Sequence, residues 1–377
     1  MKQALMLPLG EADFRKGVRV DFLRAVAPML KEIGCQVGVE LKGNEIDPDG
    51  WIKDLMTELP EARICWHPGA GIAKTLGKPD EPIPPVLEKA CAQAATLKQR
   101  YGLSVFTIHL PPAQAIEPPA DAGLERYNSP IEAEEMLGHI NRQIDPLCRL
   151  VELSDQTLAV ETVDTCNFVD AGHKLPTYLA LQTGAGQELK YLQEEVEKRS
   201  GCHLMITVDP EHVICSQNVF RRRRDMRHLP KWEPYSPTPA QRELAKITGY
   251  WLKKGYPPSS ADLKFDSIEE DILQRLEYFK PELLHLGAAI EAETDRHEIG
   301  THLPYNPWDN QQMARLDGLL QWSLQNRGHG YGWVIEVAGR RVSERYSRWS
   351  PRPDDDEVAK LMSYLVVIDR LKSLANF

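Results

Sequence analysis

The stretch LMITVDPEH, residues 204–212, contains the pattern on which the fold prediction rests. It begins with a run of apolar and β-branched residues of strand length, which ends on Asp209, and His212 follows three residues later. A run that is apolar on both faces is typical of a parallel strand covered by helices. The sequence therefore places a carboxylate and an imidazole directly after a strand that is predicted to be buried.

Seven further stretches share this length and composition. They are QALMLP (3–8), QVGVEL (36–41), ARICWH (62–67), SVFTIH (104–109), TLAVET (157–162), ELLHLG (282–287) and GWVIEV (332–337). Amphipathic stretches of helical period lie between most of them, and the clearest are residues 20–34, 85–102, 131–152 and 356–377. Eight strands alternating with helices predict an α/β fold, a single (β/α)8 TIM barrel. An open doubly wound sheet has the same rhythm, but the glycine-rich phosphate turn that usually follows its first strand is missing here.

The chain of 377 residues is long enough for one such barrel, and residues 1–377 are predicted to form a single domain. The interval between the sixth and seventh predicted strands exceeds what one loop and one helix need. Residues 213–280 are therefore predicted to be a long insertion that contains a short helix over 239–255. Because the insertion follows a strand, we expect it to emerge on the catalytic face and to cover part of the mouth.

Charge and cysteine content restrict the classes of partner and compartment. The formal net charge of −10 does not support a surface that binds nucleic acid throughout, although the arginines at 221–224 could contact a phosphate. The seven cysteines include no C-x-x-C pair, which favours a reducing, cytoplasmic compartment. No segment reaches the roughly 18 apolar residues of a membrane helix, so no membrane partner is expected.

Side chains that can bind metal stand at the ends of the third to the eighth predicted strands. They are His67, His109, Glu161, Asp209, His285 and Glu336. Any one of them alone is more often a helix cap or a hydrogen-bonded loop residue. As a set they would meet at one barrel mouth, where gathered carboxylates without a cation are costly. Mixed nitrogen and oxygen donors suit zinc, manganese or iron better than calcium.

Three more residues extend this set. His212 lies within the first helical turn after Asp209, so both can face one cavity. Asp295 and His297 are two residues apart, and in extended backbone such side chains point to the same side. We expect these groups to hold a second or third metal ion.

The motifs VDPEH (208–212) and DRHEIG (295–300) resemble those of the xylose-isomerase-like TIM barrels, which include sugar isomerases, epimerases and the endonuclease IV enzymes that act on abasic sites. The resemblance covers the strand ends from about residue 62 to residue 337. In the endonuclease IV group, three zinc ions occupy the mouth. The resemblance implies a first ion held by His67, His109 and Glu161, a second held by Glu161, Asp209, His285 and Glu336, and a third held by His212, Asp295 and His297.

Two functions follow from the resemblance. The first is a metal-dependent hydrolase that cleaves a phosphoester with up to three ions, with zinc expected first and manganese as the alternative. The second is a sugar or sugar phosphate isomerase or epimerase with one manganese-type ion on Glu161, Asp209, His285 and Glu336. In that enzyme Glu161 and Glu336 would act as paired acid and base, and His212 and Arg296 would hold substrate hydroxyls. Both predict a small phosphorylated or sugar substrate. A barrel with a vestigial site is disfavoured, because every ligand type is present.

Overall fold

Eight parallel strands close into a barrel in the computed structural model of the chain, which confirms the TIM-barrel prediction. The barrel strands are β1 (Ala4–Leu9), β2 (Gln36–Lys42), β3 (Arg63–His67), β4 (Phe106–Ile108), β5 (Leu158–Glu161), β8 (Met205–Val208), β9 (Leu283–Leu286) and β10 (Gly332–Ile335). They follow one another around the barrel in chain order, and β10 pairs with β1 to close it. All eight predicted strands are present.

The structure describes residues 3–69, 71–73, 75–110, 133–162, 166–168, 176–178, 186–212, 249–256, 268–288, 302–326, 330–337 and 356–375. Between β5 and the next helix, β6 (Cys166–Phe168) and β7 (Pro176–Tyr178) form a small antiparallel sheet that the sequence pattern does not predict. Their short runs lack the apolar composition by which the barrel strands were recognised.

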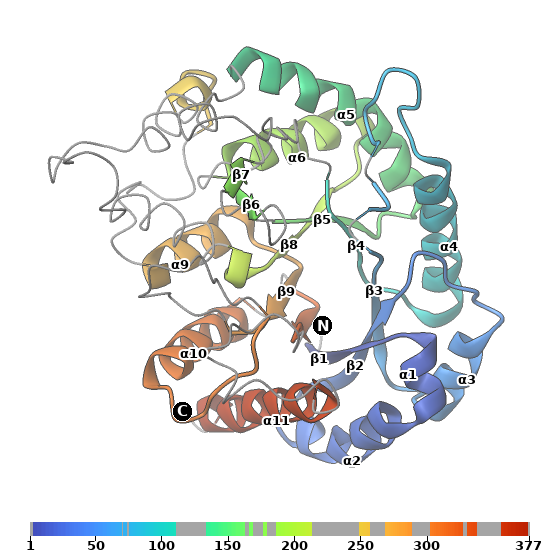
Figure 1. Cartoon of the computed structure of the whole chain (residues 1–377), viewed down its shortest axis with the longest axis vertical. Coiled ribbons are helices and arrows are strands. Elements are labelled where there is room, and N and C mark those ends of the chain that lie inside the picture. The colour runs from blue at the N-terminus through green and yellow to red at the C-terminus, as the bar shows by residue number, and fades with distance from the viewer. Residues whose placement is uncertain are drawn as a thin grey trace, which may run out of the picture.

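Helices surround the barrel (Figure 1). They are α1 (Glu11–Lys16), α2 (Val18–Glu32), α3 (Trp51–Glu58), α4 (Pro85–Tyr101), α5 (Ala133–Leu153), α6 (Gln187–Ser200), α9 (Ile268–Phe279), α10 (Asn310–Gln325) and α11 (Asp356–Ala375). The four clearest helix predictions correspond to α2, α4, α5 and α11. The last helix, α11, packs against both α10 and α2 and so completes the ring beside the first strand (Figure 1).

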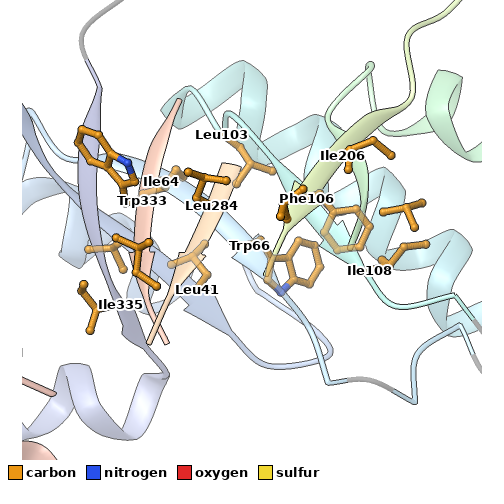
Figure 2. Packing of buried hydrophobic residues seen from close by; sticks show 14 of the residues in the cluster. Leu41, Ile64, Trp66, Leu103, Phe106, Ile108, Ile206, Leu284, Trp333 and Ile335 are labelled. Carbon is orange, nitrogen blue, oxygen red and sulfur yellow. The ribbon is translucent and has the colours of Figure 1, made fainter. Parts of the chain in front are cut away.

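Side chains that point outward from the strands form the core between barrel and helices. Trp66, Phe106, Leu284 and Trp333 belong to this layer, and each is buried (Figure 2). The Trp66 and Phe106 rings lie 4.6 Å apart, while the Trp66 Nε1–H donates to the Gly43 carbonyl at 2.8 Å. Because strand side chains alternate between two faces, the neighbours of these residues point into the barrel.

The inward side chains form an apolar layer below the mouth, here called the apolar floor. Met6, Cys65, Val105, Ala159 and Val334 are among the buried residues of this second cluster. One step further along the strands, the hydroxyls of Thr107 and Thr207 lie 2.9 Å apart across the interior. Charged side chains follow only beyond this level, so the floor separates them from solvent at the opposite end of the barrel.

The predicted insertion lies between the end of β8 at Val208 and the start of β9 at Leu283. Its described segment 249–256 packs on α6, where Trp251 is fully buried with its ring 5.1 Å from that of Tyr191. Residues 249–253 are helical, in agreement with the end of the predicted helix. Arg221–Arg224 lie outside the described residues, and the predicted cover over the mouth stays a prediction. In the described part of the chain, none of the helices combines the length and apolar character needed to cross a membrane.

Gly38 gives a test of the packing inside the barrel. A Cβ at this position would lie 2.5 Å from Met6 Cγ and 3.0 Å from the Arg63 carbonyl oxygen. We expect Gly38→Ala to lower the free energy of unfolding by about 1–3 kcal/mol, the usual range for overpacking. Gly318→Ala is the matched control, because Gly318 lies within α10 and its Cβ would meet nothing within 4 Å. That change should be neutral or stabilise by up to about 1 kcal/mol. Equal effects of the two substitutions in urea unfolding would contradict this packing.

Candidate metal centre

The alternation of side chains along the strands brings the predicted metal-capable residues together. His67 and Glu161 are the last residues of β3 and β5, and His285 lies within β9. His109, Asp209 and Glu336 each follow the last residue of their strand directly, one residue beyond the observed strand ends. All six project above the apolar floor, at the carboxyl end of the barrel where TIM-barrel active sites lie.

Glu161 lies at the centre of this group. Its Oε2 is 2.8 Å from His109 Nε2 and 3.4 Å from His67 Nε2. Its Oε1 is 3.1 Å from His285 Nδ1 and 3.6 Å from His212 Nε2. The side chain is only 1% exposed. The two oxygens of one buried carboxylate thus face two different sets of imidazoles.

Two sets of potential ligands share Glu161. The first contains His67, His109 and Glu161, and the second contains Glu161, Asp209, His285 and Glu336. Within each set, one nitrogen or oxygen from every residue lies within 4.8 Å of the others. In the second set, His285 Nδ1 is 2.6 Å from Glu336 Oε2. Both sets mix nitrogen and oxygen donors as zinc and manganese sites do, so the residues present fit divalent ions.

Two residues of β2 complete the mouth, and neither was among the predicted site residues. Glu40 is fully buried, with its Oε1 3.3 Å from His285 Nε2 and 3.7 Å from His67 Nδ1. Lys42 Nζ is 2.5 Å from Glu40 Oε2 and 3.3 Å from Glu336 Oε1. The signal was available, because Gly38, Glu40 and Lys42 alternate along one strand and therefore share its inward face.

Electrostatics in the mouth keep the carboxylates ionised. Burial by itself would raise the pKa of Glu161, but His285, His109 and His67 outweigh it and hold that pKa well below its usual range. Burial would likewise raise the pKa of Glu336, but Lys42 and His285 outweigh it and hold that pKa well below its usual range. Ionised carboxylates of this kind are the form that binds a cation.

The pKa values of two histidines in the mouth, His67 and His285, are shifted in opposite directions. Burial and the Lys42 ammonium lower the pKa of His67 to about 4, so its ring is neutral at pH 7. Lys42 Nζ lies 3.1 Å from His67 Nδ1. Because an ammonium can only donate, Nδ1 of the neutral ring accepts this hydrogen bond and the ring proton is on Nε2. For His285, burial lowers the pKa, but Glu161 and Glu336 outweigh it and raise the pKa well above its usual value. The two carboxylates thus attract positive charge to the position between them.

A further group lies beside Asp209. His212 Nε2 is 3.1 Å from Asp209 Oδ2, as the spacing in VDPEH predicts. Glu211 of the same motif is 1% exposed, and burial and Asp209 raise its pKa well above the usual value. Its carboxyl group occupies the space beside Gly287, where a Cβ would lie 1.6 Å from Glu211 Oε1. The glycine that follows β9 therefore leaves room for this side chain.

The structure brings together seven of the ten predicted site residues, namely His67, His109, Glu161, Asp209, His212, His285 and Glu336. Asp295, Arg296 and His297 lie outside the described residues, so their predicted roles stay predictions.

Comparisons with known proteins found likenesses of structure but none of sequence. No protein-family model matches the chain, and no curated protein matches it by sequence. Among solved structures, the chain is similar to D-psicose 3-epimerase of Clostridium cellulolyticum, at 12% identity, with 99% of each chain covered and a TM-score of 0.45. It is also similar to a xylose isomerase-like TIM barrel protein of Mycobacterium smegmatis, at 10% identity, with 95% of this chain and 89% of that chain covered and a TM-score of 0.43.

The reaction therefore has to be inferred from the side chains of the mouth.

Glu40 allows a test of how the mouth binds metal. Metal-ligating histidines usually donate their second ring N–H to a carboxylate, and loss of that carboxylate typically lowers metal affinity 10–100-fold. We expect Glu40→Gln to weaken zinc binding about 10–100-fold by that rule in competitive titration. Glu282→Gln is the control, because Glu282 precedes β9 at the opposite end of the barrel and contacts His203 at 2.7 Å. Unchanged zinc affinity in Glu40→Gln would show that Glu40 does not support the ligands.

Proposed function

We propose that the chain is a metal-dependent enzyme that holds two divalent ions joined by Glu161 and hydrolyses a phosphoester. The position of Glu161 is the observation that carries the proposal. One of its oxygens faces His67 and His109, and the other faces His285, so a single carboxylate can serve two ions. A one-metal site has no need of the His67 and His109 pair.

The first ion would be held by His67, His109 and Glu161, and the second by Glu161, Asp209, His285 and Glu336. Zinc is the metal proposed first, because three imidazoles take part, and manganese is the alternative. Such ions act as Lewis acids on a phosphoester and lower the pKa of an attacking water.

The chain's own residues prepare this chemistry. For His67 to offer Nε2 to an ion, its proton has to move to Nδ1, where Glu40 Oε1 lies 3.7 Å away and is the nearest acceptor carboxylate. The Lys42 ammonium would then lose its hydrogen bond to His67 Nδ1 and keep Glu40 and Glu336 as partners. An ammonium at this place would bind a non-bridging phosphate oxygen by a charge-assisted hydrogen bond. The apolar floor excludes water from below, which strengthens these interactions.

A second candidate is a sugar or sugar phosphate isomerase or epimerase. It is favoured by the set Glu161, Asp209, His285 and Glu336, which could hold one ion without the remaining histidines. Glu161 and Glu336 would then remain as an acid and base pair on separate strands, with His285 between them. In this enzyme, the substrate would be a small sugar with the Lys42 ammonium beside one of its oxygens.

His109→Ala separates the two candidates, because only the two-ion site uses His109. For the hydrolase, we expect the purified protein to lose about one ion per chain and cleavage of p-nitrophenyl phosphate esters to fall at least about 100-fold, since one of two metal sites is gone. His203→Ala is the matched control, because His203 precedes β8 at the far end of the barrel and is half exposed. An unchanged metal count in His109→Ala, together with turnover of ketoses by the parent protein, would favour the isomerase.

A further inference from the structure

His302 lies at the mouth although no sequence motif assigned it a role. Its segment returns to the barrel beside β9, where Ala288 and Leu303 exchange two backbone hydrogen bonds of 2.9 and 2.8 Å. The Glu211 carboxylate accepts a hydrogen bond from the His302 backbone N–H. Fixed at both places, the imidazole of His302 lies next to that of His212, with ring centroids 5.6 Å apart.

The backbone of His302 has a φ of +54°, a region that residues other than glycine rarely adopt. Such a conformation persists only where the surroundings fix it, and it is frequent at ligand-binding positions. Here Glu211, which is itself 1% exposed, supplies that restraint through its contact with the His302 N–H.

The donor atoms around Asp209 are arranged as a ligand set. Asp209 is 0% exposed, and its Oδ2 makes no hydrogen bond with the described residues although it faces two imidazoles. His212 Nε2 is 3.1 Å from that oxygen, and His302 Nδ1 is 4.0 Å from it. The potential ligand atoms of Asp209, His212 and His302 all lie within 4.8 Å of one another. Tetrahedral zinc places its ligand atoms about 3.4 Å apart, so small side-chain shifts would complete the site.

We propose that Asp209, His212 and His302 hold a third divalent ion, with His302 as a ligand that no sequence motif assigned. Two imidazoles and one carboxylate are a donor set typical of zinc, and three protein ligands leave a position open for substrate or water. Asp209 would be shared with the second ion, as Glu161 is shared by the first two. The inference rests on the proposed function, because it adds an ion to the same mouth.

The test is the number of zinc ions per chain, measured by mass spectrometry after saturation with zinc and removal of the excess. His302→Asn is the main variant, because asparagine tolerates a positive φ and so keeps the backbone while it removes the imidazole. We expect three ions in the parent protein and two in His302→Asn. Cobalt substitution should show the loss of one absorbing centre in His302→Asn.

The other outcomes are distinct. Equal ion counts in the parent protein and His302→Asn overturn the assignment of His302, and so does a parent protein with two ions. Loss of an ion from Asp295→Ala, while His302→Asn keeps all of its ions, returns the third site to the loop residues. A parent protein that binds one ion or none contradicts the proposed two-ion function itself. Circular dichroism of each variant establishes that it is folded.

Discussion

The carboxylate of Glu161 is the interaction on which the mouth of this barrel depends. It is buried on β5 and meets imidazoles from β3, β9 and the residue after β4 within 3.4 Å. A buried charge is tolerated only when other charges or hydrogen bonds compensate it, so the surrounding strands have to supply those groups. The neighbouring carboxylates Asp209 and Glu336 add to the same requirement. The two proposed ions, one on each side of Glu161, would balance this set of charges more completely than protons on the histidines alone.

The barrel geometry creates this requirement and also meets it. Eight parallel strands direct every carboxyl end to one side, and inward side chains from alternate strands stack in layers inside the barrel. The apolar floor around Met6 and Ala159 closes the interior below that level. As a result, the charged residues lie close together at the carboxyl end of the barrel, and small shifts of any of them change the field at the others.

Much of the fold and most of the described site could be predicted from the sequence, because both depend on local pattern. An apolar run that ends on a charged residue predicts a strand and its catalytic end at once, as with Glu161 and Asp209. The strand bounds differ by one or two residues, and hydrogen bonding often stops before the last side chain of the run, for example at Ile108 before His109.

Glu40, Lys42 and His302 were not predicted, because the pattern of residues at the ends of the predicted strands does not indicate them. Glu40 lies inside its strand, two residues before the end, and was read only as part of an apolar run. Lys42 lies one residue beyond the predicted strand 36–41, and lysines are mostly exposed. His302 is held at the mouth by the pairing of Ala288 with Leu303 and by the contact of its backbone with Glu211. Both contacts join residues that are distant in sequence. The antiparallel pair β6 and β7 is equally a tertiary feature, since neither short strand has a distinctive pattern of its own.

The most direct test of the central claim is a crystal structure of the zinc-loaded protein with anomalous data collected at the zinc edge. The account predicts two peaks flanking Glu161, each within about 2.0–2.2 Å of a different carboxylate oxygen, the usual zinc to oxygen distance. One peak should also contact His67 and His109, and the other His285 and Glu336. A single peak on Glu161, Asp209, His285 and Glu336, with His67 and His109 bound only to protein groups, would contradict the account.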